Sequence, residues 1–510
     1  MASFDVLHGP WIPVERNDGG VCELGIIDLL TQAHELNSLR CESPLENYAV
    51  TRLLAAFIMD AYQWKFPEDR KALFQAGRFD KDVLEKYVEL CLNEGASFDL
   101  FDKERPFMQA AYDPRLDKEK KNPVSVLVQS LPSGNNHVHF DHRMQGCECL
   151  TAAEALRALC ATYVFCTAGR TGPSSVNNKP CIYIISEGKN LFESLVLSAV
   201  SKREIGNIPW DEPKIAWRCF EKVIPKKEIA SVSLLSAFTW MPRRVTLIPE
   251  EPDNTGKIIV KEVYRQPGLN FKGNDLWRDP HAPYQYRKPK NSSEWKWISL
   301  KPDVGRALWR DIGALTAAEL KNTFRRQPLI LANRKKVEGA EDSIAKVTMT
   351  GLLTDQEKYI SLSYDTFDLP AVFLSNGELG DFLCGEIETI EKIAAIIPNE
   401  KGYKKLGKET CTQLQSEFFA AMYLALFSDY IPYLAALDRE KENWAIGAMA
   451  RLNEKIKAAI KNIKESADTR FGGGARNLRD MVAAGDSFYR ECMKELKKRS
   501  SDDGKREQKL

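Results

Sequence analysis

The C-terminal part of the chain repeats apolar residues at helical spacing in four successive runs. Breaks at Pro398, Pro432 and the triple glycine 472–474 separate them. One short amphipathic helix cannot bury its apolar stripe alone, so the pattern predicts an antiparallel four-helix bundle over residues 376–499. The apolar positions are Leu383, Ile387, Ile390, Ala394 and Ile397; Leu414, Phe418, Met422, Ala425 and Leu426; Leu452, Ile456, Ala459, Ile460 and Ile463; and Leu478, Met481, Phe488, Met493 and Leu496.

The residues before about Pro370 have a different pattern, in which short strand-like runs alternate with helical runs and turn-rich connections. We therefore expect an α+β protein with a large mixed domain over residues 1–372, followed by the all-α bundle. The tail 500–510 is charged and has few apolar residues, which predicts disorder.

Composition limits the classes of partner. Lys and Arg total 72 against 71 Asp and Glu, so the chain as a whole does not attract DNA or a membrane, and nucleic-acid binding has to come from local patches. The N-terminus has no secretory pattern, and we find no apolar run long enough to cross a bilayer, which favours a cytoplasmic protein without a membrane partner. The twelve cysteines are scattered without a recurring CxxC, as expected for reduced thiols.

A glycine loop lies between an apolar helical run and a strand-like run. It reads Ala168-Gly169-Arg170-Thr171-Gly172-Pro173-Ser174. Glycines beside a single arginine let the backbone approach a nucleic-acid groove or a phosphate closely. The loop fits neither a P-loop nor a dinucleotide fingerprint. From these residues alone, a structural turn and a ligand loop both remain open.

Half of the six histidines lie in one short segment. His137, His139 and His142 are followed by Cys147 and Cys149. A zinc site normally closes its tetrahedron with two separated ligand pairs, and only one cluster is present here. The segment therefore indicates either a metal site or a polar contact loop.

A basic and aromatic stretch runs from Trp277 to Lys290 and continues through 295–297. Its cations Arg287, Lys288 and Lys290 are candidates for phosphate contacts, and its aromatic rings suit base stacking. The alternative is a surface loop whose aromatic side chains fill the core. No nucleophile elbow, P-loop or paired catalytic carboxylates occur anywhere in the chain, which favours binding over catalysis.

Four segments together resemble the CasA family, the large subunit of the type I-E CRISPR surveillance complex Cascade. The segments are residues 4–14, residues 102–109, the glycine loop followed by residues 191–195, and residues 277–283. The resemblance covers nearly the whole chain. It implies a subunit without catalytic residues or cofactors that reads the protospacer-adjacent motif, opens the duplex for guide RNA pairing and helps recruit a helicase-nuclease.

The resemblance also assigns residues. It places Ala168, Gly169, Arg170 and Gly172 in a loop at the DNA minor groove, where readout is permissive. It places a wedge at Thr354, Asp355 and Gln356, with Gln356 inserted at the first base pair. The implied partners are double-stranded target DNA and guide RNA-containing Cascade with its backbone, small and guide-end-binding subunits.

One family element is missing from this chain. The lysine that reaches into the minor groove in the family falls on Gly268 here. Either Arg265, Gln266 or Lys272 replaces it, if the hairpin is shifted by a few residues, or this chain reads its motif differently. The family's flexible contact loop maps onto residues 133–149 and includes Asn136, His137, His139 and His142. Because 220–274 contains no cysteine, we expect no zinc. The alternative function is a metal-dependent nuclease or hydrolase that uses the histidines with Asp141 and Cys147.

Overall fold

The computed structural model describes most of the chain in two compact units, Met1–Leu308 with Asn322–Phe367, and Trp309–Lys321 with Asp368–Leu510. Strands and helices mix in the first unit and helices dominate the second, which confirms the α+β class. The described residues are 2–111, 120–129, 131, 148–166, 176, 180–219, 226–250, 256–272, 277–288, 293–319, 324–339, 343–355, 358–440, 443–471 and 474–507, with side chains except at 355, 358, 475, 476 and 499–507.

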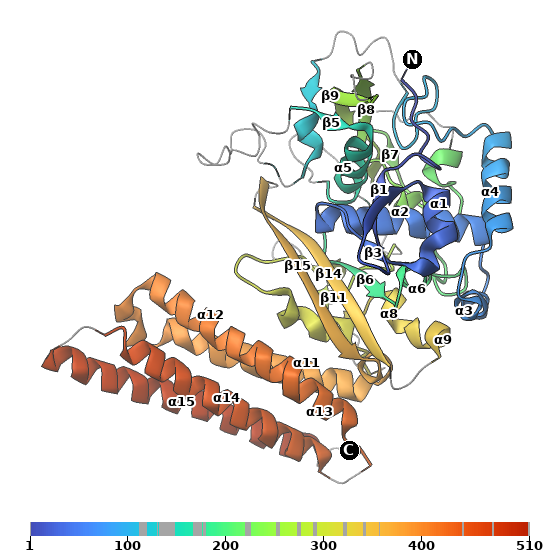
Figure 1. The fold of residues 1–510 in the computed structure, drawn as a ribbon. Helices are drawn as coiled ribbons and strands as arrows, with labels where there is room; N and C mark the ends of the chain where they lie inside the picture. The colour runs from blue at the N-terminus through green and yellow to red at the C-terminus, as the bar shows by residue number, and fades with distance from the viewer. Residues whose placement is uncertain are drawn as a thin grey trace. The chain divides into compact units, whose positions relative to one another are not determined.

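Short strands and helices alternate along the first unit (Figure 1). Its described helices are α1 (Ile26–Gln32), α2 (Pro44–Tyr62), α3 (Pro67–Ala76), α4 (Lys81–Asn93), α5 (Ala152–Val164), α6 (Leu191–Leu197), α7 (Leu234–Phe238), α8 (Leu329–Ala332) and α9 (Arg334–Glu338). Its described strands are β1 (Ile12–Arg16), β2 (Val21–Leu24), β3 (Leu36–Leu39), β4 (Asn122–Pro123), β5 (Leu150–Thr151), β6 (Tyr183–Glu187), β7 (Glu228–Ile229), β8 (Arg243–Pro249), β9 (Ile259–Pro267), β10 (Asn270–Phe271), β11 (Tyr284–Arg287), β12 (Lys296–Ser299), β13 (Arg325–Arg326), β14 (Ile344–Asp355) and β15 (Lys358–Pro370).

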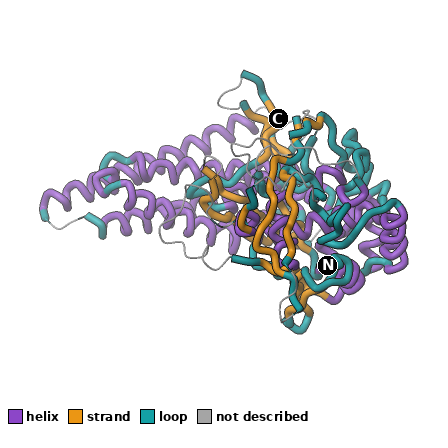
Figure 2. Tube along the Cα trace, turned by 90° about the horizontal axis from the view of Figure 1, so that it is seen from above, coloured by secondary structure: helices purple, strands orange, loops and turns teal. Residues whose placement is uncertain are grey.

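The described strands form several small sheets. Their orders are β2-β1-β3, β12-β11-β13, β15-β14-β6, the pair β10-β7, and β4-β9-β5 with β8 also on β9. The ribbon of β14 and β15 is the most prominent of them (Figures 1 and 2). Its inner strand is anchored on β6, where Met349 lies opposite Ile184, and both side chains are fully buried.

Helix α2 is the centre of the first unit. The Ser43 side chain accepts a hydrogen bond from the Leu45 N–H, Pro44 fills the first turn, and the helix ends at Gln63 in the left-handed region. Nearly all of the helix is buried, because α5, α6, α7, β6 and β14 pack around it. A helix enclosed on all sides fixes the elements that surround it.

Long helices run side by side in the second unit (Figure 2). α14 packs against α12 and α15, while α11 packs against α12 and α15. The described helices are α10 (Val372–Ser375), α11 (Gly377–Ile396), α12 (Lys408–Ala425), α13 (Ile431–Ala436), α14 (Trp444–Asp468) and α15 (Ala475–Glu507), and a π-helical segment, Leu426–Tyr430, joins α12 to α13.

The apolar stripe of α15 agrees in part with the predicted one: Phe488 and Leu496 are buried as expected, while Met481 and Met493 are partly buried. Leu478 is 59% exposed, whereas Ala484, Phe488, Cys492 and Leu496 are buried. These buried positions recur every four residues, so they form one row along the helix. The backbone of α15 continues to Glu507 and covers most of the range 500–510, for which the sequence predicts disorder.

The expectation that no segment is long and apolar enough to cross a bilayer is wrong for one helical run. Lys408–Ala436 reaches a mean hydropathy of 1.3 over an 18-residue window, which is sufficient by length and composition. Leu414, Phe418 and Met422 are fully buried within the second unit. The window as a whole is 39% buried. One such helix is weak evidence for a membrane span, because the core helices of helical bundles reach the same length and hydropathy.

The segment Trp309–Lys321 belongs to the second unit, although the sequence places it inside the first domain. Trp309 contacts the ring of Phe419 edge-on at 6.1 Å, and Arg310 forms an ion pair with Glu391. These partners follow it by about 80 to 110 residues, so helical periodicity could not reveal them.

Candidate nucleic-acid interface

The glycine loop is anchored in the core on both sides. α5 begins with a capping box between Thr151 and Glu154, and beyond its end Phe165 and Cys166 are buried. The chain returns to the core at Cys181 and Ile182. The loop residues Ala168, Gly169, Arg170 and Gly172 lie outside the described residues. The loop therefore starts and ends on fixed points of the first unit.

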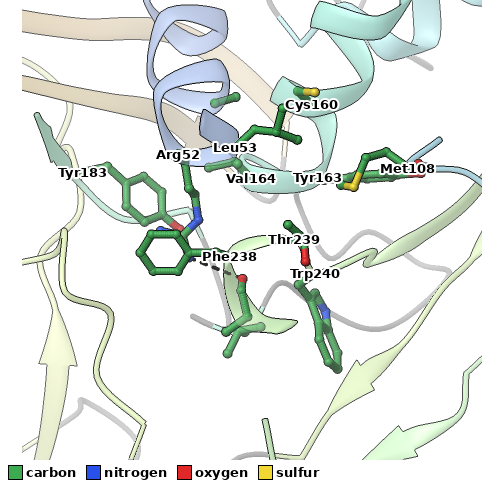
Figure 3. A pocket seen from close by; sticks show the side chains of 13 residues that line it. Arg52, Leu53, Met108, Cys160, Tyr163, Val164, Tyr183, Phe238, Thr239 and Trp240 are labelled. Carbon is green, nitrogen blue, oxygen red and sulfur yellow. Dashed lines mark hydrogen bonds between the residues drawn. The ribbon is translucent and has the colours of Figure 1, made fainter. Parts of the chain in front are cut away.

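A small cavity lies beside these anchors (Figure 3). Tyr163 and Val164 of α5 line it together with Arg52 of α2, and Phe238 and Trp240 complete the lining from α7 and the segment after it. Its volume of about 30 Å³ has room for one or two waters and not for a ligand. The cavity is thus part of the packing around the end of α5.

A second, larger cavity has a volume of about 410 Å³. Its lining includes Lys214 and Arg218, and both form ion pairs with Glu94, at 3.2 and 2.8 Å. Arg218 also pairs with Asp60 at 3.0 Å. These contacts hold the two cations in structural ion pairs, so they are not poised for acid-base chemistry.

The backbone around Gly268, where the resemblance to CasA places the family lysine, leaves no room for a side chain. Its N–H donates to the Pro242 carbonyl at 3.0 Å, and a Cβ added to it would lie 2.4 Å from the Met241 oxygen and 2.6 Å from the Arg243 nitrogen. Backbone atoms cannot move aside as a flexible side chain can. No side chain fits here while β8 keeps its place.

The three substitutes for that lysine differ in their surroundings. Gln266 accepts a hydrogen bond from Arg244 at 3.1 Å, and Lys272 forms an exposed ion pair with Glu228 at 2.7 Å. Arg265 is partly buried, and its Nε–H has no acceptor among the described residues.

The position of Arg265 links it to the glycine loop. Burial lowers the pKa of Arg265, and both Cys166 and Arg243 are close enough to interact with its charge. Cys166 is the last described residue before the loop. A buried N–H without an acceptor carries a desolvation cost that an incoming anion would relieve. Of the three substitutes, Arg265 has the geometry best suited to a ligand beside the loop.

The proposed wedge lies between β14 and β15, which are neighbours in their sheet. β14 ends at Asp355 and β15 begins at Lys358. Thr354 is partly buried in β14, the side chain of Asp355 is not described, and Gln356 lies outside the described residues. Strands of 12 and 13 residues thus flank this position.

The basic and aromatic stretch divides into a buried part and an exposed part. Its first part is core: the buried Asp279 pairs with Arg52 of α2 at 2.8 Å, and His281 contacts the Tyr48 hydroxyl at 2.9 Å and the Ser198 carbonyl at 2.7 Å. The second part, with Arg287 and Lys288, is exposed, while Lys290 lies outside the described residues. The first half therefore belongs to the core, and phosphate contacts by the exposed Arg287 and Lys288 stay a prediction.

The histidine segment is not part of the described chain. Asn136, His137, His139 and His142 lie outside it, as do Asp141 and Cys147, while Cys149 is exposed. Across the residues that the structure does describe, no group of three or more His, Cys, Asp or Glu side chains is arranged to hold a metal ion.

Comparison with known proteins identifies the family. The sequence model described as CRISPR-associated protein Cse1 matches residues 5–421. The chain belongs to the Cse1 family. The resemblance to CasA drawn from the four motif segments is thereby confirmed, since CasA and Cse1 name the same family.

Known relatives of this Cse1-family chain cover most of its length. The CasA/Cse1 protein of Thermus thermophilus is 28% identical over 391 residues, which are 74% of this chain and 72% of that protein. The crystal structure of Cse1 from Acidimicrobium ferrooxidans superposes with a TM-score of 0.79 at 19% identity, covering 98% and 99% of the two chains. A chain of a CRISPR RNA-guided surveillance complex has a TM-score of 0.74 at 19% identity, covering 97% and 100%. These structures share the fold.

Sequence reasoning about this Cse1-family chain missed the partners of residues 277–283. Tyr48 and Arg52 lie four residues apart on α2, and Arg52 contacts both Asp279 and the ring of Phe238, the latter at 3.9 Å. An arginine in the middle of a largely apolar helix was the available signal, because such a charge needs a buried partner.

His281 should make the stability of this Cse1-family chain depend on pH. Burial lowers its pKa from 6.5 to about 4. The nearby Asp279 carboxylate opposes this shift, and the positive charge of Arg52 adds to it. The unfolded chain therefore binds the proton more readily, and the stability that neutral His281 contributes above pH 6.5 is lost as the pH falls toward 4. Between pH 7 and pH 5 the loss should be about 2 kcal/mol.

Urea unfolding of the wild type and of His281→Gln at both pH values measures this loss. Glu46 makes stability change with pH in the opposite direction, because burial raises its pKa to about 7 despite the nearby Arg157. Its contribution cancels when the two proteins are compared with each other. A difference between them that stays constant from pH 7 to pH 5 would contradict the role of His281.

Proposed function

We propose that this Cse1-family chain is the non-catalytic large subunit of a cytoplasmic CRISPR RNA-guided surveillance complex, in which it reads the protospacer-adjacent motif in duplex DNA. Family membership supports the assignment to such a complex, as does a fold shared with a chain of a solved surveillance complex. The observation that carries the DNA-reading role is Arg265, whose buried N–H has no acceptor within the described part of the chain and whose charge interacts with Cys166 at the anchor of the glycine loop.

The readout proceeds through the minor groove in this proposal. Gly169 and Gly172 let the loop backbone approach the groove, and Arg170 and Arg265 supply the positive charge that the groove attracts. Because the minor groove mainly distinguishes A·T from G·C pairs, several flanking motifs should be accepted. Arg265 thereby takes the part that a lysine has in the family.

Opening of the duplex follows at the tip of the β14–β15 ribbon. Gln356 would insert at the first base pair, where separating a base step costs a few kcal/mol. β14 and β15 are neighbours in their sheet, and β14 also pairs with β6, so the ribbon is joined to the first unit. The guide RNA, held by backbone, small and guide-end-binding subunits, then pairs with the target strand, and the opened complex recruits a helicase-nuclease.

Gln356→Ala should slow duplex opening by about tenfold or more, because the wedge no longer offsets the cost of the first unstacked step. The measurement is permanganate reactivity of target thymines after mixing with the reconstituted complex. Glu357→Ala, on the same ribbon tip, is the matched control and should open DNA at the wild-type rate.

A target already mismatched next to the motif tests the assignment independently. On that target Gln356→Ala should behave like the wild type. If it opens fully paired DNA normally, Gln356 is not the wedge.

The absence of catalysis is tested with the purified chain and plasmid DNA in Mg²⁺ or Mn²⁺. Cleavage that a chelator and His139→Ala both abolish would overturn the non-catalytic role and favour the nuclease alternative.

A further inference from the structure

The small sheet β12-β11-β13 carries aromatic side chains on one face. Tyr286 pairs with Trp297 across the antiparallel strands, and the N–H of Tyr286 donates to the Phe324 carbonyl at 2.8 Å, next to β13. Trp295 lies two residues before Trp297 and so shares its face. Four aromatic residues from three chain segments thus lie on the same side of the sheet. We call Tyr286, Trp295, Trp297 and Phe324 the aromatic platform.

The side chains on this face are buried at one end of the sheet and exposed at the other. Tyr284 and its cross-strand partner Ser299 are each only 7% exposed, so this end of the face belongs to the core. At the other end Trp295 is 52% exposed and Phe324 is 57% exposed. Large aromatic side chains left half in water are unusual, and clusters of them mark interaction surfaces.

The rings are already in contact with one another. Tyr286 stacks on Trp295 with centroids 5.6 Å apart and planes 29° apart, and its centroid lies 5.4 Å from that of Trp297. Trp295 reaches Phe324 at 6.0 Å. The Arg326 guanidinium lies over the ring of Trp297 at 4.2 Å. These contacts hold the rings in place before any ligand arrives, which reduces the entropy lost on binding.

Positive charge surrounds the platform. The three strands and their flanks carry the cations Arg287, Lys288, Lys296, Arg325 and Arg326, against the single carboxylate of Glu294 among the described flanking residues. Glu294 pairs with Lys296 at 3.3 Å. In the described part of the chain, Arg287 and Lys288 form no ion pair and are exposed. The charge therefore favours an anionic ligand with flat apolar groups.

We propose that the aromatic platform binds an unpaired DNA strand by stacking its bases. Bases of an intact duplex are stacked on each other and cannot use such a surface, whereas unpaired bases stack on exposed aromatic rings regardless of sequence while cations contact the phosphates. The inference rests on the proposed function, because opening of the duplex beside the motif supplies the unpaired strand.

Fluorescence anisotropy of a labelled 15-nucleotide thymidine strand with the full-length chain tests the platform. Trp295→Ala and Phe324→Ala should each weaken binding about 5- to 100-fold. Trp295→Phe, which keeps a ring, should recover most of the affinity. Phe66→Ala is the matched control: Phe66 is 42% exposed with Lys65 5.3 Å from its ring centroid, yet lies outside the platform, so binding should not change.

Two further measurements separate stacking from charge. An abasic strand of equal length should bind the wild type and Trp295→Ala equally, because it has phosphates without bases. Arg287→Ala should reduce the slope of log affinity against log salt by about 0.7, whereas Trp295→Ala should leave the slope unchanged.

If both alanine variants bind the thymidine strand as tightly as the wild type, the proposal is wrong. Equally effective displacement of the strand by a polyglutamate peptide would also overturn it, since the surface would then be an electrostatic patch only. Motif-dependent duplex opening by Gln356 variants is measured separately, so failure of the platform and failure of the proposed function give different results.

Discussion

Asp279→Ala should lower the free energy of unfolding by about 3–5 kcal/mol, because it leaves the Arg52 guanidinium buried without its counter-ion. The two side chains are 5% and 0% exposed and lie 2.8 Å apart. Burial is the largest single influence on the pKa of Asp279 and raises it, but Arg52 and His281 together outweigh burial and hold the pKa of that carboxyl below its usual range. The Asp279 carboxylate also accepts the His281 N–H at 3.0 Å, so the loss extends to the turn that contains His281.

Urea and thermal unfolding of the purified chain measure this effect. Glu454→Ala is the control, since Glu454 pairs with Lys457 at 2.8 Å on an exposed helix face, where ion pairs contribute little to stability.

A double variant tests whether the lost stability comes from the unpaired charge of Arg52. Arg52→Met with Asp279→Leu removes both charges and should recover much of the lost stability, since buried pairs can often be replaced by apolar groups. If Asp279→Ala alone unfolds like the wild type, the pair does not hold α2 to residues 277–283.

Gly268→Ala should destabilise the chain by about 1–3 kcal/mol, and Gly268→Lys by at least as much, because even a Cβ overlaps the backbone at Met241 and Arg243. The strand pairing of β8 with β9 must open to admit it. Thermal unfolding of both variants measures the cost. Gly385→Ala is the matched control: its Cβ would meet nothing within 4 Å in α11, so it should be neutral or stabilising.

The Gly268→Lys variant also addresses DNA reading. If it folds with wild-type stability, the backbone around β8 can adapt, and a lysine at 268 again becomes compatible with the family arrangement. If it is destabilised as expected, the charge beside the glycine loop has to come from another residue, and Arg265→Ala should weaken motif-dependent binding.

The sequence predicted well those features that depend on local periodicity. Three of the four helical stripes are buried largely where spacing placed them, as Leu383, Leu414 and Leu452 show. The fourth was right for Phe488 and Leu496 but wrong for Leu478, because α15 offers several apolar rows and its contacts with α11 and α14 select the buried one.

Candidate site residues were predicted less completely. The resemblance to CasA named the glycine loop, the wedge and three replacements for the missing lysine, but it gave no reason to prefer one replacement. The choice of Arg265 depends on its burial beside Cys166, which is 99 positions earlier in the chain. Such proximity arises from tertiary packing, and no periodic pattern in the sequence indicates it.

The sequence by itself determined the α+β class, the helical C-terminal region and the family, because periodic apolar residues and ordered motifs act through neighbouring residues. The tertiary structure alone decided that Asp279 is core while Trp295 is surface, although both belong to one basic and aromatic stretch. The physical reason is that a side chain's environment is set by partners such as Arg52, 227 residues away, and an ion pair or a stack forms only once the fold brings its members together.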